Sequence, residues 1–352
     1  MSPYLHKKLY WQKIRGICIL GVVFIHCPSA LDYSRVSELT WIIFRQIIVF
    51  PVAVFMFLAG YFLDLSKYKN YRNLLKVRGG RLLIPYLMWS IVYLGLDIVR
   101  IIIHGDTVQW ADILLRLLTG RAIVPFYYIV VLFIFTLISP ILKKIIEERQ
   151  GRGWLDIIVL SITPLYSLIV YCLLIRMIDI NPYFTMTPFA WIMFYYVGMR
   201  IRYDERAHGK TKRVTTYMVF ILLFLSMIEA IIMNYAELNI NMVIGQLKYS
   251  SLLYSLFLIK WFYNKCDKNQ TDNFLLSKIL VWFGDNSYAI YLSHSLVLML
   301  VSRVTNTVTG LWLGKYVLSF LLTVILSSVM IIVVKRIAIG LKMGNVLKLI
   351  GF

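Results

Sequence analysis

Long apolar stretches separated by short polar segments dominate the chain. Ten stretches have about the length of a membrane-crossing helix, which needs roughly 17–25 mostly apolar residues. They cover residues 14–31, 41–63, 82–103, 123–142, 156–175, 187–200, 214–233, 243–262, 286–303 and 316–337. The sixth is short and aromatic, and the ninth allows an earlier start near Ile279 with a break at Gly284-Asp285-Asn286. The pattern therefore predicts an all-α, polytopic membrane protein with about ten transmembrane helices in a single domain, residues 1–352.

Positive charge along the chain gives a separate test of this topology. With the N-terminus inside, 28 of the 37 lysines and arginines fall in cytoplasmic segments, and nine, Lys248 among them, fall outside. Cytoplasmic segments of membrane proteins carry an excess of Lys and Arg. The division predicts an even number of spans with both termini in the cytoplasm, in a multi-pass protein of the cytoplasmic (inner) membrane.

Composition excludes other classes of protein. Hydrophobic residues make up 60% of the 352 residues and charged residues 15%, which a soluble domain of this size cannot bury. The net charge of +20 comes from short basic blocks between apolar stretches, so we expect a lipid bilayer as partner and no nucleic acid. The four cysteines and five histidines have no metal-ligand spacing, and no metal is expected.

A few polar residues lie inside the apolar stretches, where they are costly and are therefore functional candidates. His26 lies 11 residues after Arg15, which is roughly 17 Å of helix rise. The alternative is a histidine bonded to a neighbouring helix or placed near the outer interface. Further along, Ser287, Tyr291 and His294 have the spacing of one helix face. Hydrogen bonding between helices would explain that second group equally well.

Arg78 and Arg81 stand at the start of the third stretch, on either side of Gly79-Gly80. Residues at i and i+3 of a helix point the same way, and two guanidinium groups suit a phosphate ligand. The glycines would allow close approach of a ligand to the backbone. The alternative is ordinary anchoring at the cytoplasmic surface.

Four motifs in this order resemble the acyltransferase 3 family of integral membrane acyltransferases. They are Arg15-Gly16-Ile17 with Val22-Val23-Phe24-Ile25-His26, Phe55-Met56-Phe57-Leu58-Ala59-Gly60-Tyr61-Phe62, Arg78 and Arg81 before Ile84-Pro85-Tyr86, and Phe283-Gly284-Asp285-Asn286-Ser287-Tyr288-Ala289-Ile290-Tyr291-Leu292-Ser293-His294. The resemblance covers nearly the whole chain. Gln12 stands where the family usually has an aspartate, Ser295 replaces a frequent proline, and Pro125-Phe126-Tyr127-Tyr128-Ile129 replaces a run of the His-Leu-Trp-Phe type.

The resemblance implies transfer of an acyl group, with acetyl favoured, from cytoplasmic acyl-CoA to a hydroxyl of an envelope polysaccharide or a lipid-linked sugar. In that reaction we expect His26 to act as general base, while Arg78, Arg81 and Arg15 bind acetyl-CoA. We expect Tyr128, Ser287, Tyr291 and His294 to line the substrate pocket. Two alternatives stay open: a lipid or polysaccharide transporter or flippase without acyl transfer, and a subunit of a synthase complex that acts by binding alone.

Overall fold

The computed structural model describes residues 3–27, 35–175, 182–208, 214–266, 274–308 and 312–352. Within these ranges every regular element is helical and no strand occurs, as the sequence predicts. The chain divides into two compact units that alternate along the sequence. The first unit comprises Met1–Gly21, Leu31–Leu65 and Ile138–Gly284, and the second comprises Val22–Ala30, Ser66–Leu137 and Asp285–Phe352.

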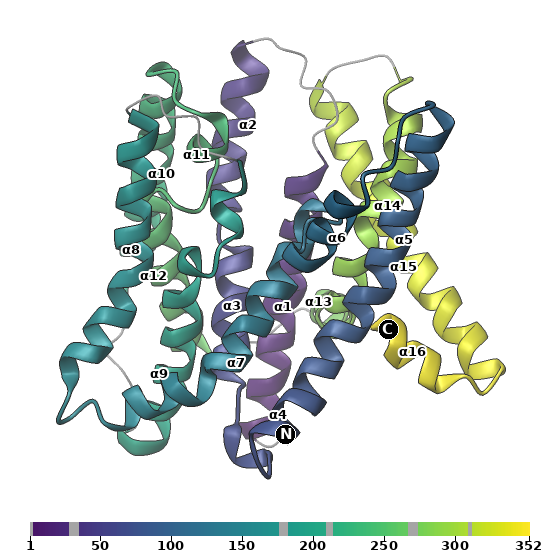
Figure 1. The fold of residues 1–352 in the computed structure, drawn as a ribbon. Coiled ribbons are helices and arrows are strands. Elements are labelled where there is room, and N and C mark those ends of the chain that lie inside the picture. Colours follow the sequence, from purple (N-terminus) through teal and green to yellow (C-terminus); the bar gives the residue numbers. More distant parts are fainter. Residues whose placement is uncertain (1–2, 28–34, 176–181, 209–213, 267–273, 309–311) are drawn as a thin grey trace. The chain divides into compact units, whose positions relative to one another are not determined.

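The first unit contains helices from the N-terminal part and the central part of the chain. They are α1 (Pro3–His26, whose last turn belongs to the second unit), α2 (Arg35–Ile47), α3 (Pro51–Tyr61), α8 (Gly153–Ile175), α9 (Ile192–His208), α10 (Thr216–Tyr235), α11 (Ile240–Val243), α12 (Tyr249–Lys265) and α13 (Phe274–Asp285). Short 3₁₀ turns, η4 (Pro182–Met186) and η5 (Pro188–Ala190), precede α9. Within this unit α3 packs on α9, and α10 packs on α12 (Figure 1).

The second unit contains the remaining elements. They are α4 (Tyr71–Leu74), the π-helical turn η2 (Leu75–Gly79), α5 (Gly80–Ile103), α6 (Trp110–Thr119), η3 (Val124–Phe126), the first half of α7 (Tyr127–Glu147), α14 (Ser287–Thr305), α15 (Trp312–Gly340) and α16 (Gly344–Ile350); the short turn η1 (Leu65–Lys67) stands at the border. Helices α14 and α15 lie side by side, and α16 lies against α5 (Figure 1). The core of the second unit is a cluster of aromatic and aliphatic residues from α5, η3, the segment before η3, α7 and α14, namely Tyr86, Tyr93, Leu94, Ala122, Phe126, Ile129 and Leu292.

Each of the ten predicted spans overlaps a helix of the structure, and in the described ranges seven helical segments are long and apolar enough to cross a membrane. The spans predicted at 14–31, 187–200 and 243–262 correspond to α1, α9 and α12, which are not among these seven. The count of ten and the orientation of the termini therefore stay predictions. Residues 28–31 of the first span lie outside the described residues. The break predicted at Gly284-Asp285-Asn286 is confirmed, because α13 ends at Asp285 and α14 begins at Ser287.

Glycines allow α3 and α9 to touch backbone to backbone in the first unit. A Cβ atom on Gly60 would lie 2.1 Å from the carbonyl oxygen of Tyr195, and one on Gly198 would lie 2.1 Å from the carbonyl oxygen of Phe57. No side chain other than hydrogen fits at either position, because such contacts are far inside the normal packing distance. Gly60 belongs to the aromatic motif Phe55–Phe62 of the sequence, so this motif has a packing role.

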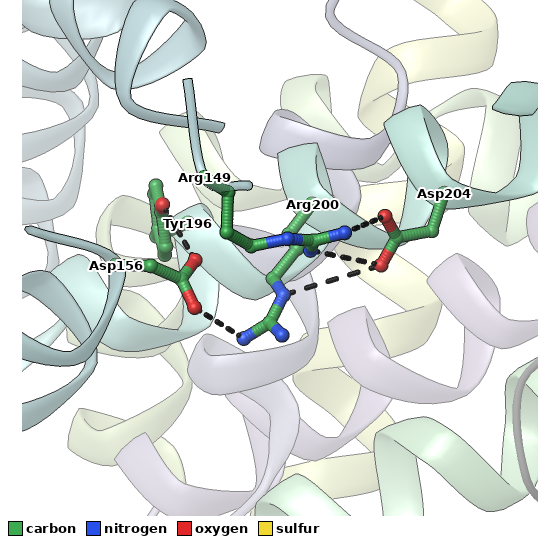
Figure 2. Close-up of polar contacts among 5 residues, drawn as sticks. All are labelled: Arg149, Asp156, Tyr196, Arg200 and Asp204. Atoms are coloured by element: carbon green, nitrogen blue, oxygen red, sulfur yellow. Dashed lines mark hydrogen bonds and ion pairs between the residues drawn. The ribbon is translucent and has the colours of Figure 1, made fainter. Parts of the chain in front are cut away.

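A chain of ion pairs ties α8 and the segment before it to α9. The two terminal nitrogens of the Arg149 guanidinium donate to Asp204, at 3.3 and 2.8 Å, and Arg200 Nη1 lies 2.9 Å from Asp156 Oδ2. Figure 2 shows these contacts. The hydroxyl of Tyr196 also donates to Asp156, at 2.8 Å. The hydrogen bonds that Arg149 donates to the Asp204 carboxylate raise the pKa of Arg149. Two arginines and two aspartates balance in charge, so this cluster is structural rather than a site for a charged ligand.

Lys248 is buried completely in the first unit, beside α2 and α10. Its ammonium donates to the side-chain oxygen of Gln46 and to Ser251 Oγ, the latter at 2.9 Å, and lies 3.5 Å from Ser226 Oγ. The charge count assigns Lys248 to a segment outside the membrane, and the structure shows that its side chain is nevertheless buried. A buried lysine is tolerated because three neutral oxygen atoms replace water around it.

Candidate active site

Two of the predicted site histidines are neighbours in the second unit. His26 is the last residue of α1 and is half-buried, whereas His294 in α14 has an exposed fraction of 0%. Their ring centroids lie 5.5 Å apart, with the ring planes tilted by 41°. Residues 268 positions apart in the sequence thus supply two adjacent imidazole rings.

The last turn of α1 is held in place by α15. The ring of Phe24 packs edge-on against Tyr316, at a centroid distance of 4.7 Å, and against Phe320 at 5.3 Å. The hydroxyl of Tyr316 donates to the carbonyl oxygen of Phe24. Since Phe24 stands two residues before His26, these contacts fix the backbone that carries the histidine.

The start of α14 sets the position of the other predicted residues. Asn286 separates α13 from α14, and Lys335 Nζ of α15 donates to Asn286 Oδ1 at 2.6 Å. Ser287 is the first residue of α14, and Tyr291 and His294 follow along the helix. The rings of Tyr291 and His294 lie 6.3 Å apart, so the predicted spacing brings these two side chains together.

Aromatic rings continue from His294 into the core of the second unit. Tyr291 lies 5.7 Å from the ring of Tyr128 and 6.1 Å from that of Phe126. On its own helix Tyr291 stacks with Tyr288 at 6.4 Å and 8°. Its hydroxyl donates to the carbonyl oxygen of Pro125. The predicted residues Tyr128, Tyr291, His294 and His26 therefore form one continuous row of rings.

The hydrogen bonds of His294 define which of its nitrogens carries the proton. Nδ1 lies 2.8 Å from the carbonyl oxygen of Tyr291 and 3.1 Å from that of Ile290. A carbonyl oxygen only accepts, so Nδ1 is the protonated nitrogen. The other nitrogen, Nε2, lies 3.3 Å from Ser295 Oγ. All these partners are neutral and the ring is fully buried, which favours the neutral imidazole with a lone pair on Nε2.

Arg78 and Arg81 occupy different environments at the start of α5. Arg78 belongs to the π-helical turn η2 and is half-buried, while Arg81 lies in the first turn of α5 and is exposed. Wider turns of this kind occur often at functional sites. The expectation that Gly79 leaves room for a ligand is wrong, because a Cβ there would lie 3.1 Å from the ring of Phe133. Gly80 has more open surroundings, with Ile84 Cδ1 at 3.8 Å from its Cβ position.

Arg15, the third predicted donor-binding residue, belongs to the first unit. Its Nη1 donates to Gln12 Oε1 at 3.3 Å, and its guanidinium lies over the ring of Phe62 at 5.3 Å. Gln12 occupies the position where the family that the sequence resembles usually has aspartate. The amide supplies an oxygen acceptor at that position but no negative charge.

The hydrophobic pattern does not single out Tyr93, Tyr288, Tyr316 or Lys335, although each contacts an element that carries a predicted residue. Their signal in the sequence is a hydroxyl or ammonium group inside an otherwise apolar stretch, which needs a partner when buried. In the described part of the chain, no three His, Cys, Asp or Glu side chains are grouped so as to hold a metal ion.

The fold and this row of residues define a polytopic helical membrane protein with paired histidines in a largely apolar interior. The family model for an acyltransferase domain matches residues 9–332, nearly the whole chain. The protein therefore belongs to the acyltransferase 3 family, which implies an acyl transfer function at a membrane. Comparison with curated proteins gave no match, and neither did comparison with solved structures.

Proposed function

We propose that this protein is a membrane O-acyltransferase that moves an acyl group, with acetyl favoured, from cytoplasmic acyl-CoA to a hydroxyl of an envelope polysaccharide or lipid-linked sugar. The observation that carries the proposal is the approach of His26 to His294, at 5.5 Å between ring centroids, within a chain of the acyltransferase 3 family. The proposed location is the cytoplasmic (inner) membrane, with both termini in the cytoplasm.

His26 is the proposed general base. A half-buried imidazole at the end of a helix is accessible to a substrate hydroxyl, and in its neutral form it would accept the hydroxyl proton. The imidazole takes the hydroxyl proton as the hydroxyl oxygen attacks the thioester carbonyl carbon. The new C–O ester bond forms, the C–S bond breaks, and CoA leaves as a thiolate that receives the proton from the imidazolium. This chemistry uses no metal ion.

Arg78 and Arg81 are proposed to bind the phosphates of acetyl-CoA, with Arg15 as a further cation for the donor. Exposure of Arg81 at the start of α5 suits capture of a soluble phosphate ligand, since guanidinium groups bind phosphate oxygens bidentately. Binding of CoA to the Arg78→Ala/Arg81→Ala protein tests this role. We expect weaker binding than for a Lys67→Ala/Lys69→Ala control, which removes two cations of the neighbouring segment. Equal affinities for the two variants would refute it.

Tyr128, Ser287, Tyr291 and His294 are proposed to line the substrate pocket. The rings of Tyr128 and Tyr291 supply an apolar and aromatic wall, and the sugar rings of glycans pack well on such surfaces. The Tyr291 hydroxyl is already bonded to Pro125, so its contribution is the face of the ring rather than a hydrogen bond to the acyl oxygen.

Transfer of label from acetyl-CoA tests the function directly. Membranes containing the protein, its His26→Ala variant or neither receive radiolabelled acetyl-CoA together with native envelope glycan. His104→Ala is the matched control, because His104 is an exposed histidine at the end of α5. We expect labelled glycan with the wild-type and His104→Ala proteins and none with His26→Ala. Label with all three proteins would remove His26 from the chemistry, and label with none would favour the transporter or flippase.

A further inference from the structure

The hydroxyl of Tyr93 forms two hydrogen bonds to the backbone of α14, at one pair of residues that a helical hydrogen bond would otherwise join. It donates to the carbonyl oxygen of Leu292 at 2.9 Å and accepts from the N–H of Leu296 at 3.0 Å. These two groups, four residues apart, are the pair that an α-helix normally joins directly. A side chain that bonds to such a pair changes the local geometry of the helix.

The ring of Tyr93 is held firmly, so its hydroxyl has a fixed position. Tyr93 has an exposed fraction of 5% and packs edge-on against Phe126 at 5.3 Å and 86°. Trp89, one turn earlier on α5, adds a second ring at 6.1 Å. Tyr93 also belongs to the core cluster of the second unit with Leu292. The contact therefore transmits the position of α5 to one turn of α14.

That turn of α14 contains His294. Its Nδ1–H bonds to the carbonyl oxygens of Tyr291 and Ile290, which the helical ladder would otherwise assign to backbone N–H groups. A carbonyl oxygen has two lone pairs and can accept this second hydrogen bond, whose geometry depends on where the backbone of that turn places the imidazole. The two residues that Tyr93 bonds, Leu292 and Leu296, lie on either side of His294 in the same turn.

We infer that Tyr93 is a positioning residue that sets the His294 turn of α14 and so keeps His294 as the tautomer with Nδ1 protonated, with Nε2 toward Ser295 Oγ and the ring beside that of His26. The position of the His294 ring decides how it contacts the imidazole of His26, whose ring centroid lies 5.5 Å away. The effect on catalysis rests on the proposed function, because it takes His26 as the base. The effect on the tautomer does not depend on any reaction.

The test compares Tyr93→Phe with Tyr86→Phe. Both remove one hydroxyl from the same core cluster, but the Tyr86 hydroxyl donates to Leu117 in α6 and not to α14. The protein is labelled with ¹⁵N-histidine in lipid nanodiscs, and the His294 signals are assigned from their loss in His294→Gln. We expect a single Nδ1–H tautomer in the wild-type and Tyr86→Phe proteins and a mixture in Tyr93→Phe. A single Nε2–H tautomer in the wild type would overturn the inference even if neither variant folds.

Acyl transfer by the same proteins supplies the second readout. We expect kcat to fall about 10- to 100-fold in Tyr93→Phe with little change in KM for the donor, because a small displacement of a catalytic group has effects of this size. Tyr86→Phe should stay within about twofold of wild type. An unchanged tautomer or equal rates in the two variants would overturn the inference. If the wild type transfers no label, the proposed function fails, and the tautomer measurement alone decides the role of Tyr93.

Discussion

Replacing Gly60 with alanine is expected to loosen the contact between α3 and α9. The new Cβ would lie 2.1 Å from the carbonyl oxygen of Tyr195, and Gly198 faces Phe57 at the same distance. A backbone carbonyl cannot rotate away as the end of a side chain does. The two helices must therefore separate by about 1 Å, with loss of packing along their whole contact.

The size of the effect follows from two opposing contributions. Overpacking costs typically about 1–3 kcal/mol, and a clash between two backbones belongs at the upper end. Alanine is favoured over glycine inside a helix by about 0.5–1 kcal/mol, which offsets part of that cost. We expect Gly60→Ala to lower the free energy of unfolding by about 2 kcal/mol. Gly198→Ala should lower the free energy of unfolding by less in the double variant than it does alone, because Gly60→Ala has already opened the interface.

Reversible unfolding in mixed detergent micelles, followed by circular dichroism at increasing dodecyl sulfate content, measures these differences. Gly95→Ala is the matched control, since a Cβ at that position in α5 meets nothing within 4 Å. The control should be as stable as wild type or up to about 1 kcal/mol more stable. If Gly60→Ala is no less stable than Gly95→Ala, the backbone contact between α3 and α9 does not constrain the fold.

Four further substitutions probe three charged groups of the first unit. Burial alone would raise the pKa of Glu205, but hydrogen bonds from Lys7 and Tyr61 and the charges of Lys7 and Arg202 lower it below its ordinary value. The stabilisation is then present above the ordinary glutamate pKa and lost as pH falls through the lowered value. Glu205→Gln should therefore reduce the thermal unfolding temperature at pH 7 and match wild type in acid. Asp156→Asn should destabilise by about 2 kcal/mol in detergent unfolding, because Arg200 loses a charged partner, and an equal stability would refute the ion-pair chain of Figure 2. Lys248→Met should leave the free energy of unfolding unchanged or raise it. Gln46→Leu should lower it by about 1–3 kcal/mol, because the buried ammonium of Lys248 loses a hydrogen-bond acceptor. A Lys248→Met protein less stable than Gln46→Leu in the same unfolding assay would contradict this account.

Helix positions follow from the hydrophobic pattern because each span must satisfy its backbone hydrogen bonds internally. The pattern misses the interruptions where apolarity is unbroken. Residues 41–63 form one apolar stretch, but α2 ends at Ile47 and α3 begins at Pro51. Proline lacks an N–H and is favoured in the first turn of a new helix, so Pro51 carries a local signal that hydrophobicity alone ignores.

The candidate site is predicted only in part, for a physical reason. His26 and His294 stand out because ionisable residues inside spans are costly, and this signal is local. Their proximity at 5.5 Å depends on which helices pack together, and no periodicity in one segment encodes that. Tyr93 escapes notice for the same reason, because a tyrosine in an apolar stretch is ordinary until the group that its hydroxyl meets is known.

The tyrosines of α14 and His294 of the same helix differ in where their hydrogen bonds go. Tyr288 and Tyr291 bond across to other elements, at the carbonyl oxygens of Leu82 and Pro125. Within the described residues, the hydrogen bonds of His294 all stay within α14 itself. Helix association is therefore served by the tyrosines and does not explain why an ionisable group is buried completely. The ring of His26 lies next to this buried ring, and because the proposed function assigns roles to both histidines, the two are best tested as one unit.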